Sequence, residues 1–230
     1  MSLPVNEKNK VIDRYTERFR VHGYSPKTLG WDKGKQDIRF GVLTSRYDFH
    51  GKSVLDIGCG FGDLNKTLVA CCGGNDYRYH GIDLVQALID EGRQRYLLPN
   101  VRFTCGDILD SSIEGDEGIY DYAIASGIFN FKLVEMDNYA YIESVIRTAL
   151  RLSREGLAFD FLSDKVDRQY EHTFHSSPEK ILGIAFKYSR NVILRNDYMP
   201  FEFALFINKD DSFLKEDTVF NHFRRCGSVF

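Results

Sequence analysis

The feature that most constrains the fold is a glycine-rich loop between an apolar run and a helical pattern. Residues 53–57 form a buried-strand pattern that contains one acid, Asp56, and residues 58–62 supply three glycines. Residues 63–72 then have helical spacing, and the Gly73-Gly74 pair ends that pattern. Glycines at a strand-to-helix junction permit a tight turn and let the backbone approach a ligand closely. An ordinary glycine-rich turn is the alternative, so the neighbouring residues must show whether this loop binds a ligand.

Strand and helix patterns alternate along the chain after this loop. Such alternation predicts parallel βαβ units and a doubly wound α/β sheet with helices on both faces. The polar connection that ends at residue 119 has room for a short helix. We expect strands at 77–83, 101–105, 120–125 and 157–162, and helices at 85–97 and 138–152.

The pattern changes after the fifth strand. Ser177 and Pro178 are typical of a helix N-cap and first helical position, and that helix should run to about Lys187. Two strand patterns follow, at 191–198 and 201–208, separated only by two residues. So short a link excludes a parallel crossover, so these strands should be antiparallel.

Two helical patterns precede the first strand. The first carries Val11, Ile12, Tyr15 and Phe19 on one face and ends at Gly23, and the second carries Ile38, Val42 and Leu43. Without repeats or a flexible linker, the 230 residues suit one domain. We divide it into an N-terminal helical cover (1–50), a ligand-binding core (51–208) and a tail (209–230) that the sequence does not place.

Composition narrows the function classes. The formal net charge of −3 argues against general nucleic-acid or membrane binding. Five cysteines without a regular spacing favour reduced thiols in the cytoplasm, and no paired CxxC pattern suggests a metal site. The N-terminal residues lack the apolar region of a signal peptide, and no apolar run has the length of a membrane span.

The acids around the glycine loop identify the kind of ligand. A nicotinamide oxidoreductase has GxGxxG, whereas this loop is GxGxG with Asp63 at the last position of that pattern. Asp56, directly before the loop, suits a cationic ligand better than a pyrophosphate. A sulfonium compound with an amino group and no phosphate, such as S-adenosylmethionine, meets that requirement.

Three further pairs of residues stand where predicted strands end, which is where ligands bind in open α/β sheets. Asp83 suits a pair of ribose hydroxyls, and Leu84 beside it suits the adenine. A carboxylate at Asp107 suits the adenine amino group, with Ile108 as an apolar wall. The fourth strand ends in Ser126 and Gly127.

Together these motifs resemble the class I S-adenosylmethionine-dependent methyltransferases over about residues 53–208. The resemblance rests on residues 56–62, 81–84, 106–108 and 120–130. It implies a Rossmann-like, seven-stranded, mostly parallel sheet with an antiparallel last strand. By position, it places Gly58, Cys59, Gly60 and Gly62 along the methionine part of the cofactor, Asp83 at the ribose, and Asp107 with Ile108 at the adenine.

The resemblance implies an enzyme that uses S-adenosylmethionine and releases S-adenosylhomocysteine. We expect O- or N-methylation of a small-molecule acceptor, because the Pro-Pro motif of nucleic-acid amino-methyltransferases is absent after the fourth strand. A protein or nucleic-acid acceptor remains an alternative, as does a regulatory protein that binds the cofactor without turnover. The sequence does not indicate the oligomeric state.

The sequence offers weaker candidates for the other residues that line the ligand site. Trp31, the single tryptophan, either lines the site or packs elsewhere. Arg39 is expected to be an ordinary surface arginine, with a pairing to the cofactor carboxylate as the alternative. His172 and His175 are candidates for a general base or an acceptor contact, although an ordinary loop is the simpler interpretation. Methyl transfer from a sulfonium gains much of its rate from alignment, so the lack of an evident catalytic dyad does not exclude an enzyme.

Overall fold

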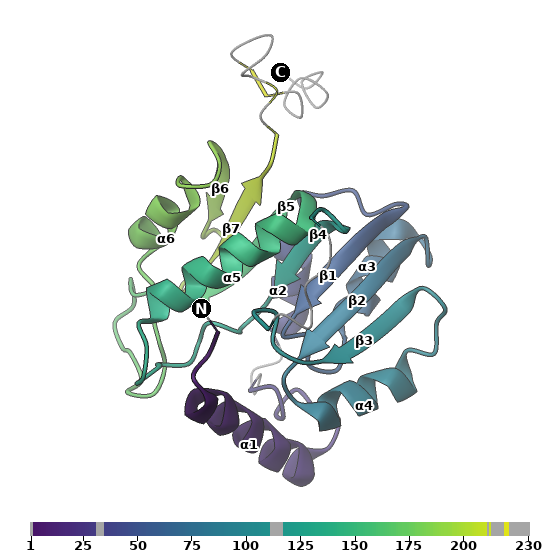
Figure 1. Cartoon of the computed structure of the whole chain (residues 1–230), viewed down its shortest axis with the longest axis vertical. Coiled ribbons are helices and arrows are strands. Elements are labelled where there is room, and N and C mark those ends of the chain that lie inside the picture. The colour runs from purple at the N-terminus through teal and green to yellow at the C-terminus, as the bar shows by residue number, and fades with distance from the viewer. Residues whose placement is uncertain (1, 31–34, 111–116, 211, 213–218, 221–230) are drawn as a thin grey trace.

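A seven-stranded sheet forms the centre of the computed structural model (Figure 1). The structure describes all residues except 1, 31–34, 111–116, 211, 213–218 and 221–230. The strand order is β3-β2-β1-β4-β5-β7-β6. The strands are β1 (Lys52–Ile57), β2 (Tyr77–Asp83), β3 (Val101–Cys105), β4 (Tyr120–Ala125), β5 (Ser153–Leu162), β6 (Asn191–Arg195) and β7 (Glu202–Asn208).

The direction of the strands confirms the predicted sheet. β3, β2, β1, β4 and β5 are parallel, and β7 is inserted antiparallel between β5 and β6. Two strand boundaries differ from the prediction by more than one residue. β5 begins at Ser153, directly after a helix, and β6 ends at Arg195, so the link to β7 is longer than two residues.

Helices cover both faces of the sheet, as predicted. On one face, the second helix packs on β5 and the third on β2, whereas on the other face the fifth helix packs on β4 and β5 and the sixth on β6 and β7. The fourth lies along β3 and β2. The helices are α1 (Val5–His22), α2 (Gln36–Thr44), α3 (Leu64–Cys72), α4 (Gln86–Arg95), α5 (Asn138–Leu152) and α6 (Pro178–Ala185).

Local sequence signals explain where several helices begin and end. Gly73 adopts a left-handed conformation (φ 61°) after α3, and the amide of Gly74 donates to the carbonyl of Val69. Ser177 caps α6 by accepting a hydrogen bond from the amide of Lys180, with Pro178 at the first helical position. These residues therefore act as the sequence predicted.

The sheet order reverses between β1 and β4, which places the crevice of an open α/β sheet at their carboxyl ends. In Figure 1, the strand arrowheads on this side point toward α1, which lies across that edge of the sheet. The predicted short helix before β4 falls partly on residues 111–116, and the tail falls mostly on residues outside the described ranges. Within the described ranges, no helix combines the length and apolar composition that crossing a membrane requires.

Candidate functional site

A cavity of about 820 Å³ lies at the carboxyl ends of the central strands, beneath α1. It brings together residues from the carboxyl ends of β1–β5, the glycine loop, α1 and α2, although they are far apart in the sequence. The sequence-predicted site residues that line it are Asp56, Gly58, Cys59, Gly60, Asp83, Leu84, Asp107, Ile108, Ser126, Gly127, Arg39, His172 and His175.

The glycine loop is held against the end of β2. The amides of Gly58 and Cys59 both donate to the carbonyl oxygen of Ile82, at 2.8 and 3.1 Å. Gly58 has a φ of 70°, and a Cβ at this position would lie 2.1 Å from a methyl carbon of Ile128. Only glycine combines this backbone conformation with the space that remains.

Gly62 has a different role from the other two glycines of the loop. It is not among the residues that line the cavity. Its φ is 82°, and a Cβ there would lie 2.5 Å from the ring of Phe103 on β3. Packing of the loop against β3 therefore explains this glycine.

Asp83 joins the glycine loop to the end of β2. One carboxylate oxygen accepts a hydrogen bond from the amide of Gly60 at 2.8 Å, and the other accepts one from Val85 at 2.9 Å. Burial raises the pKa of Asp83, and the amide hydrogen bonds oppose that shift. Each oxygen keeps capacity for a further donor, which suits a pair of ribose hydroxyls.

Asp56 is a buried carboxyl on the floor of the cavity. Its exposed fraction is 4%, and the hydroxyl of Tyr79 donates to it at 2.7 Å. Burial raises its pKa to about 7, the Tyr79 hydrogen bond opposes this shift, and the nearby carboxylates of Asp83 and Asp63 add to it. A cationic ligand in the cavity would favour the ionised form. Sequence reasoning did not find Tyr79, which looked like an ordinary strand residue.

Asp107 presents a buried oxygen that makes no hydrogen bond. Its Oδ1 accepts from the amide of Leu109 at 3.0 Å, whereas Oδ2 is buried without a hydrogen-bond partner. The Nζ atom of Lys8, on α1, forms an ion pair with this Oδ2 at 3.1 Å and also bonds to Asp110. No sequence signal pointed to Lys8, because the pairing depends on how α1 crosses the sheet.

Ser126 and Gly127 are fixed by a second buried acid. The amide of Gly127 donates to Asp160 Oδ1 at 2.7 Å, and the hydroxyl of Ser126 donates to Oδ2. Burial, followed by the charge of Glu202, raises the pKa of Asp160 to about 6. Asp160 was missed in the sequence, although a lone acid within the apolar β5 pattern was a signal for it.

Arg39 corrects an expectation. It is only 6% exposed, so its interpretation as an ordinary surface arginine was wrong. Its Nε atom donates to Oε2 of Glu202 at 2.6 Å, and its Nη2 atom pairs with Oε1. This pair, which lines the cavity, joins α2 to the start of β7 and compensates the burial of both charges.

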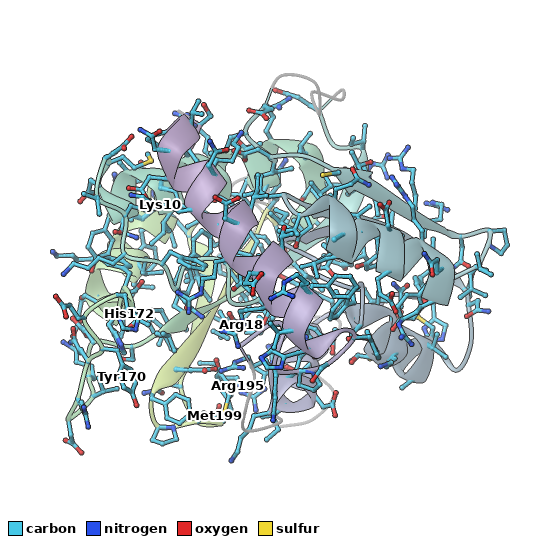
Figure 2. The ribbon with its side chains drawn as sticks, turned by 90° about the horizontal axis from the view of Figure 1, so that it is seen from below. Lys10, Arg18, Tyr170, His172, Arg195 and Met199 are labelled. Carbon is cyan, nitrogen blue, oxygen red and sulfur yellow. The ribbon has the colours of Figure 1, made fainter. Side chains whose placement is uncertain are left out.

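The helix α1 forms the cover of the cavity. Its residues Val11, Arg14, Tyr15 and Arg18 line the space. Near one end, Glu7 accepts hydrogen bonds from the amides of residues 134 and 135, at 2.8 and 3.1 Å. Beyond the other end, the hydroxyl of Tyr24 donates to Asp63 at 2.6 Å. Figure 2 shows α1 crossing this face of the molecule, with Arg18 on the helix and Tyr170 and His172 on the neighbouring loop. Trp31 lies outside the described residues.

The two histidines differ in their surroundings. His175 Nδ1 lies 2.8 Å from the carbonyl oxygen of Ser163, and its Nε2 lies 3.0 Å from the hydroxyl of Thr173. Among the described residues, none makes a hydrogen bond with the ring of His172. Of the two, His172 therefore has the freer ring at the cavity wall. The described part of the chain contains no group of three metal-ligating side chains.

Comparisons with known proteins agree with this architecture. Residues 54–156 match a family model described as a methyltransferase domain. A protein of Mycobacterium tuberculosis named as a methyltransferase, Rv1506c, is 29% identical over 163 residues, which is 68% of this chain and 93% of that protein.

Solved structures share the fold. Magnesium protoporphyrin IX methyltransferase from Synechocystis PCC 6803, with bound S-adenosylhomocysteine, has a TM-score of 0.61 at 16% identity, covering 88% of this chain and 99% of that one. The pyocyanin biosynthetic protein PhzM has a TM-score of 0.62 at 14% identity, covering 84% of this chain and 61% of that one.

The sheet order and the inserted antiparallel strand are those of the Rossmann-like fold that these methyltransferase structures share. With the methyltransferase-domain match over residues 54–156 and the relative from Mycobacterium tuberculosis, these features make the chain similar to class I S-adenosylmethionine-dependent methyltransferases.

Proposed function

We propose that this chain is an S-adenosylmethionine-dependent methyltransferase, and that its small-molecule acceptor binds beside the cofactor in the covered cavity. The observation that carries the proposal is the shape of the site. One cavity of about 820 Å³ extends from the acids of β1–β3 to the loops after β4 and β5. This volume is typical of small-molecule sites, and side chains of α1 form part of the lining. A large substrate would have to reach its methylated atom beneath that helix.

The residues at the β1–β3 end fit S-adenosylmethionine. The buried carboxyl of Asp56 suits the cationic part of the cofactor, and Asp83 suits the ribose hydroxyls. Asp107 Oδ2, which is paired with Lys8 at 3.1 Å, keeps a second lone pair that suits the adenine amino group. The bound cofactor supplies a methyl group activated on a sulfonium.

The protein's own contribution is to orient the acceptor and exclude water. The acceptor wall consists mainly of rings and aliphatic groups, which favour an apolar or aromatic body. Its residues are Phe129, Phe131, Tyr141, Leu162, Val166, Tyr170 and Phe201. Of the two histidines, we assign His172 to contact with the methyl acceptor. If the methylated atom carries a proton, His172 also serves as the general base that removes it. The names of two structural neighbours also refer to small molecules, magnesium protoporphyrin IX and pyocyanin.

A radiolabel experiment tests the proposal. The protein is incubated with methyl-labelled S-adenosylmethionine and a cell extract separated into metabolites and macromolecules. We expect label in the metabolite fraction, with formation of S-adenosylhomocysteine. Label only in protein or nucleic acid would show that the acceptor is a macromolecule and would contradict the proposal. Tight S-adenosylhomocysteine binding without transfer to either fraction would favour the regulatory alternative.

A further inference from the structure

The basic side chains that line the cavity divide into paired and unpaired groups. Arg39 is paired with Glu202. Arg18 donates from Nε to the carbonyl oxygen of Lys27 at 3.0 Å, and its guanidinium lies 3.9 Å from the position of a Cβ on Gly30, in the segment between α1 and α2. By contrast, no ion pair within the described ranges involves Arg14, Arg168 or Lys35, and Lys35 lies directly before α2, away from the loops after β4 and β5 in the sequence.

The acids of the cavity are distributed differently. Asp56, Asp83 and Asp107 stand at the ends of β1, β2 and just after β3, and Glu202 is neutralised by Arg39. On the acceptor side, α1 contributes the guanidinium of Arg14 and the loop after β5 contributes that of Arg168. Among the described lining residues, the loops after β4 and β5 contribute no carboxylate. The cavity is therefore acidic where the cofactor is proposed to bind and basic on the acceptor side.

Arg14 and Arg168 belong to connected parts of this wall. The guanidinium of Arg14 lies over the ring of Phe131, 5.2 Å from its centroid, and that of Arg168 lies 5.6 Å from the centroid of Tyr170. Phe131 forms a β-bridge with Thr173, so the loops after β4 and β5 are joined. Both arginines line the cavity while their side chains remain exposed, which places them at its mouth.

From this arrangement we infer that the acceptor is an anion, a carboxylate or a phosphate ester with an apolar body. Its negative group is held at the mouth by Arg14 and Arg168, with His172 on the same loop as Arg168, and its body packs on the aromatic wall. A guanidinium already stacked on a ring keeps its N–H donors for an oxyanion. The inference rests on the proposed function, because it names the substrate class of that same site.

A pair of matched probes tests the charge preference without knowledge of the natural acceptor. Binding of 2-naphthoate and of its neutral amide is measured by calorimetry on protein saturated with S-adenosylhomocysteine, in a chloride buffer of low ionic strength. We expect tighter binding of the carboxylate. Each exposed arginine should account for roughly two- to fivefold of that preference, which is the range of exposed ion pairs, and added salt should reduce it.

The variants Arg14→Gln and Arg168→Gln, alone and combined, should lose the preference while retaining S-adenosylhomocysteine affinity. Arg20→Gln is the matched control, since Arg20 lies on the same helix, pairs with Glu17 and does not line the cavity. Equal binding of the two probes, binding of neither, or a preference that survives in the double variant would overturn the inference. S-adenosylhomocysteine affinity, measured first on every protein, separates these results from a failure of the proposed function, which would show as absent cofactor binding.

Discussion

Replacing Asp56 by Asn tests the electrostatic character of the cavity floor. Burial raises the pKa of Asp56 to about 7, whereas an unfolded chain has a value near ~3.9. The folded state therefore holds one more proton between about pH 4 and pH 7, and its stability falls as the pH rises through that window. The slope is at most about 1.4 kcal/mol per pH unit, which accumulates to about 4 kcal/mol by neutral pH.

An asparagine keeps the shape and can still accept the Tyr79 hydrogen bond, but it has no charge to bury. Its free energy of unfolding should equal that of the native protein near pH 4 and exceed it by a few kcal/mol at pH 7, where the native carboxyl is half ionised. Urea unfolding of both proteins at a series of pH values measures the difference. Parallel pH profiles would refute the reasoning, because they would show that Asp56 ionises equally in both states.

The same variant should bind S-adenosylhomocysteine more weakly at pH 8, since it lacks the carboxylate for the cationic amino group. Native affinity should increase about tenfold from pH 6 to pH 8, as the ionised fraction of a group with a pKa of about 7 rises from roughly 0.1 to 0.9. The variant's affinity should be flat over this range. If the affinity of the variant changed with pH as that of the native protein does, the pH dependence would belong to a group other than Asp56.

Three further outcomes are expected. Asp83→Ala should weaken S-adenosylhomocysteine binding roughly ten- to a hundredfold by calorimetry without unfolding the domain, because it removes a charged acceptor and frees the amide of Gly60; an unchanged dissociation constant would contradict the ribose role. Gly58→Ala should lower the melting temperature more than Gly51→Ala, since both have positive φ but only a Cβ at position 58 meets a neighbour within 4 Å; equal losses would show that the steric contact does not matter. S-adenosylhomocysteine should change the fluorescence of Trp31 and the protease protection of residues 20–35 if the N-terminal segment acts as a lid, and no change in either would favour a static cover.

Much of the sheet could be predicted because its signals are local. β2, β3, β4 and α5 have the predicted boundaries, since each is an apolar or periodic run, and β2 ends at an acid and β3 directly before a glycine. The strand-end acids were found for the same reason, as parallel strands bring their carboxyl ends to one edge. The boundary of β5 was missed because α5 passes into it without a turn residue.

The pairings that complete the site could not be predicted in this way. Arg39 and Glu202 are separated by 163 positions, and they meet only because β7 is inserted beside β5. Lys8 reaches Asp107 only because α1 crosses the sheet edge. The local sequence around a basic residue does not show whether a distant acid will pair with it. The burial of such a residue is therefore determined by the tertiary structure alone.

The buried acids of the cavity are compensated unequally, and the inequality indicates where a ligand contributes most. Asp83 has two backbone amides, and Glu202 has a guanidinium. Asp56 has one phenolic hydroxyl, and Asp107 Oδ2 has an ion pair without a hydrogen bond. A buried acceptor or charge that lacks a full set of partners costs free energy in the unliganded protein. Donors supplied by a ligand at Asp56 and Asp107 would offset that cost. A substitution that removes either acid should therefore stabilise the unliganded protein and weaken its binding of the cofactor.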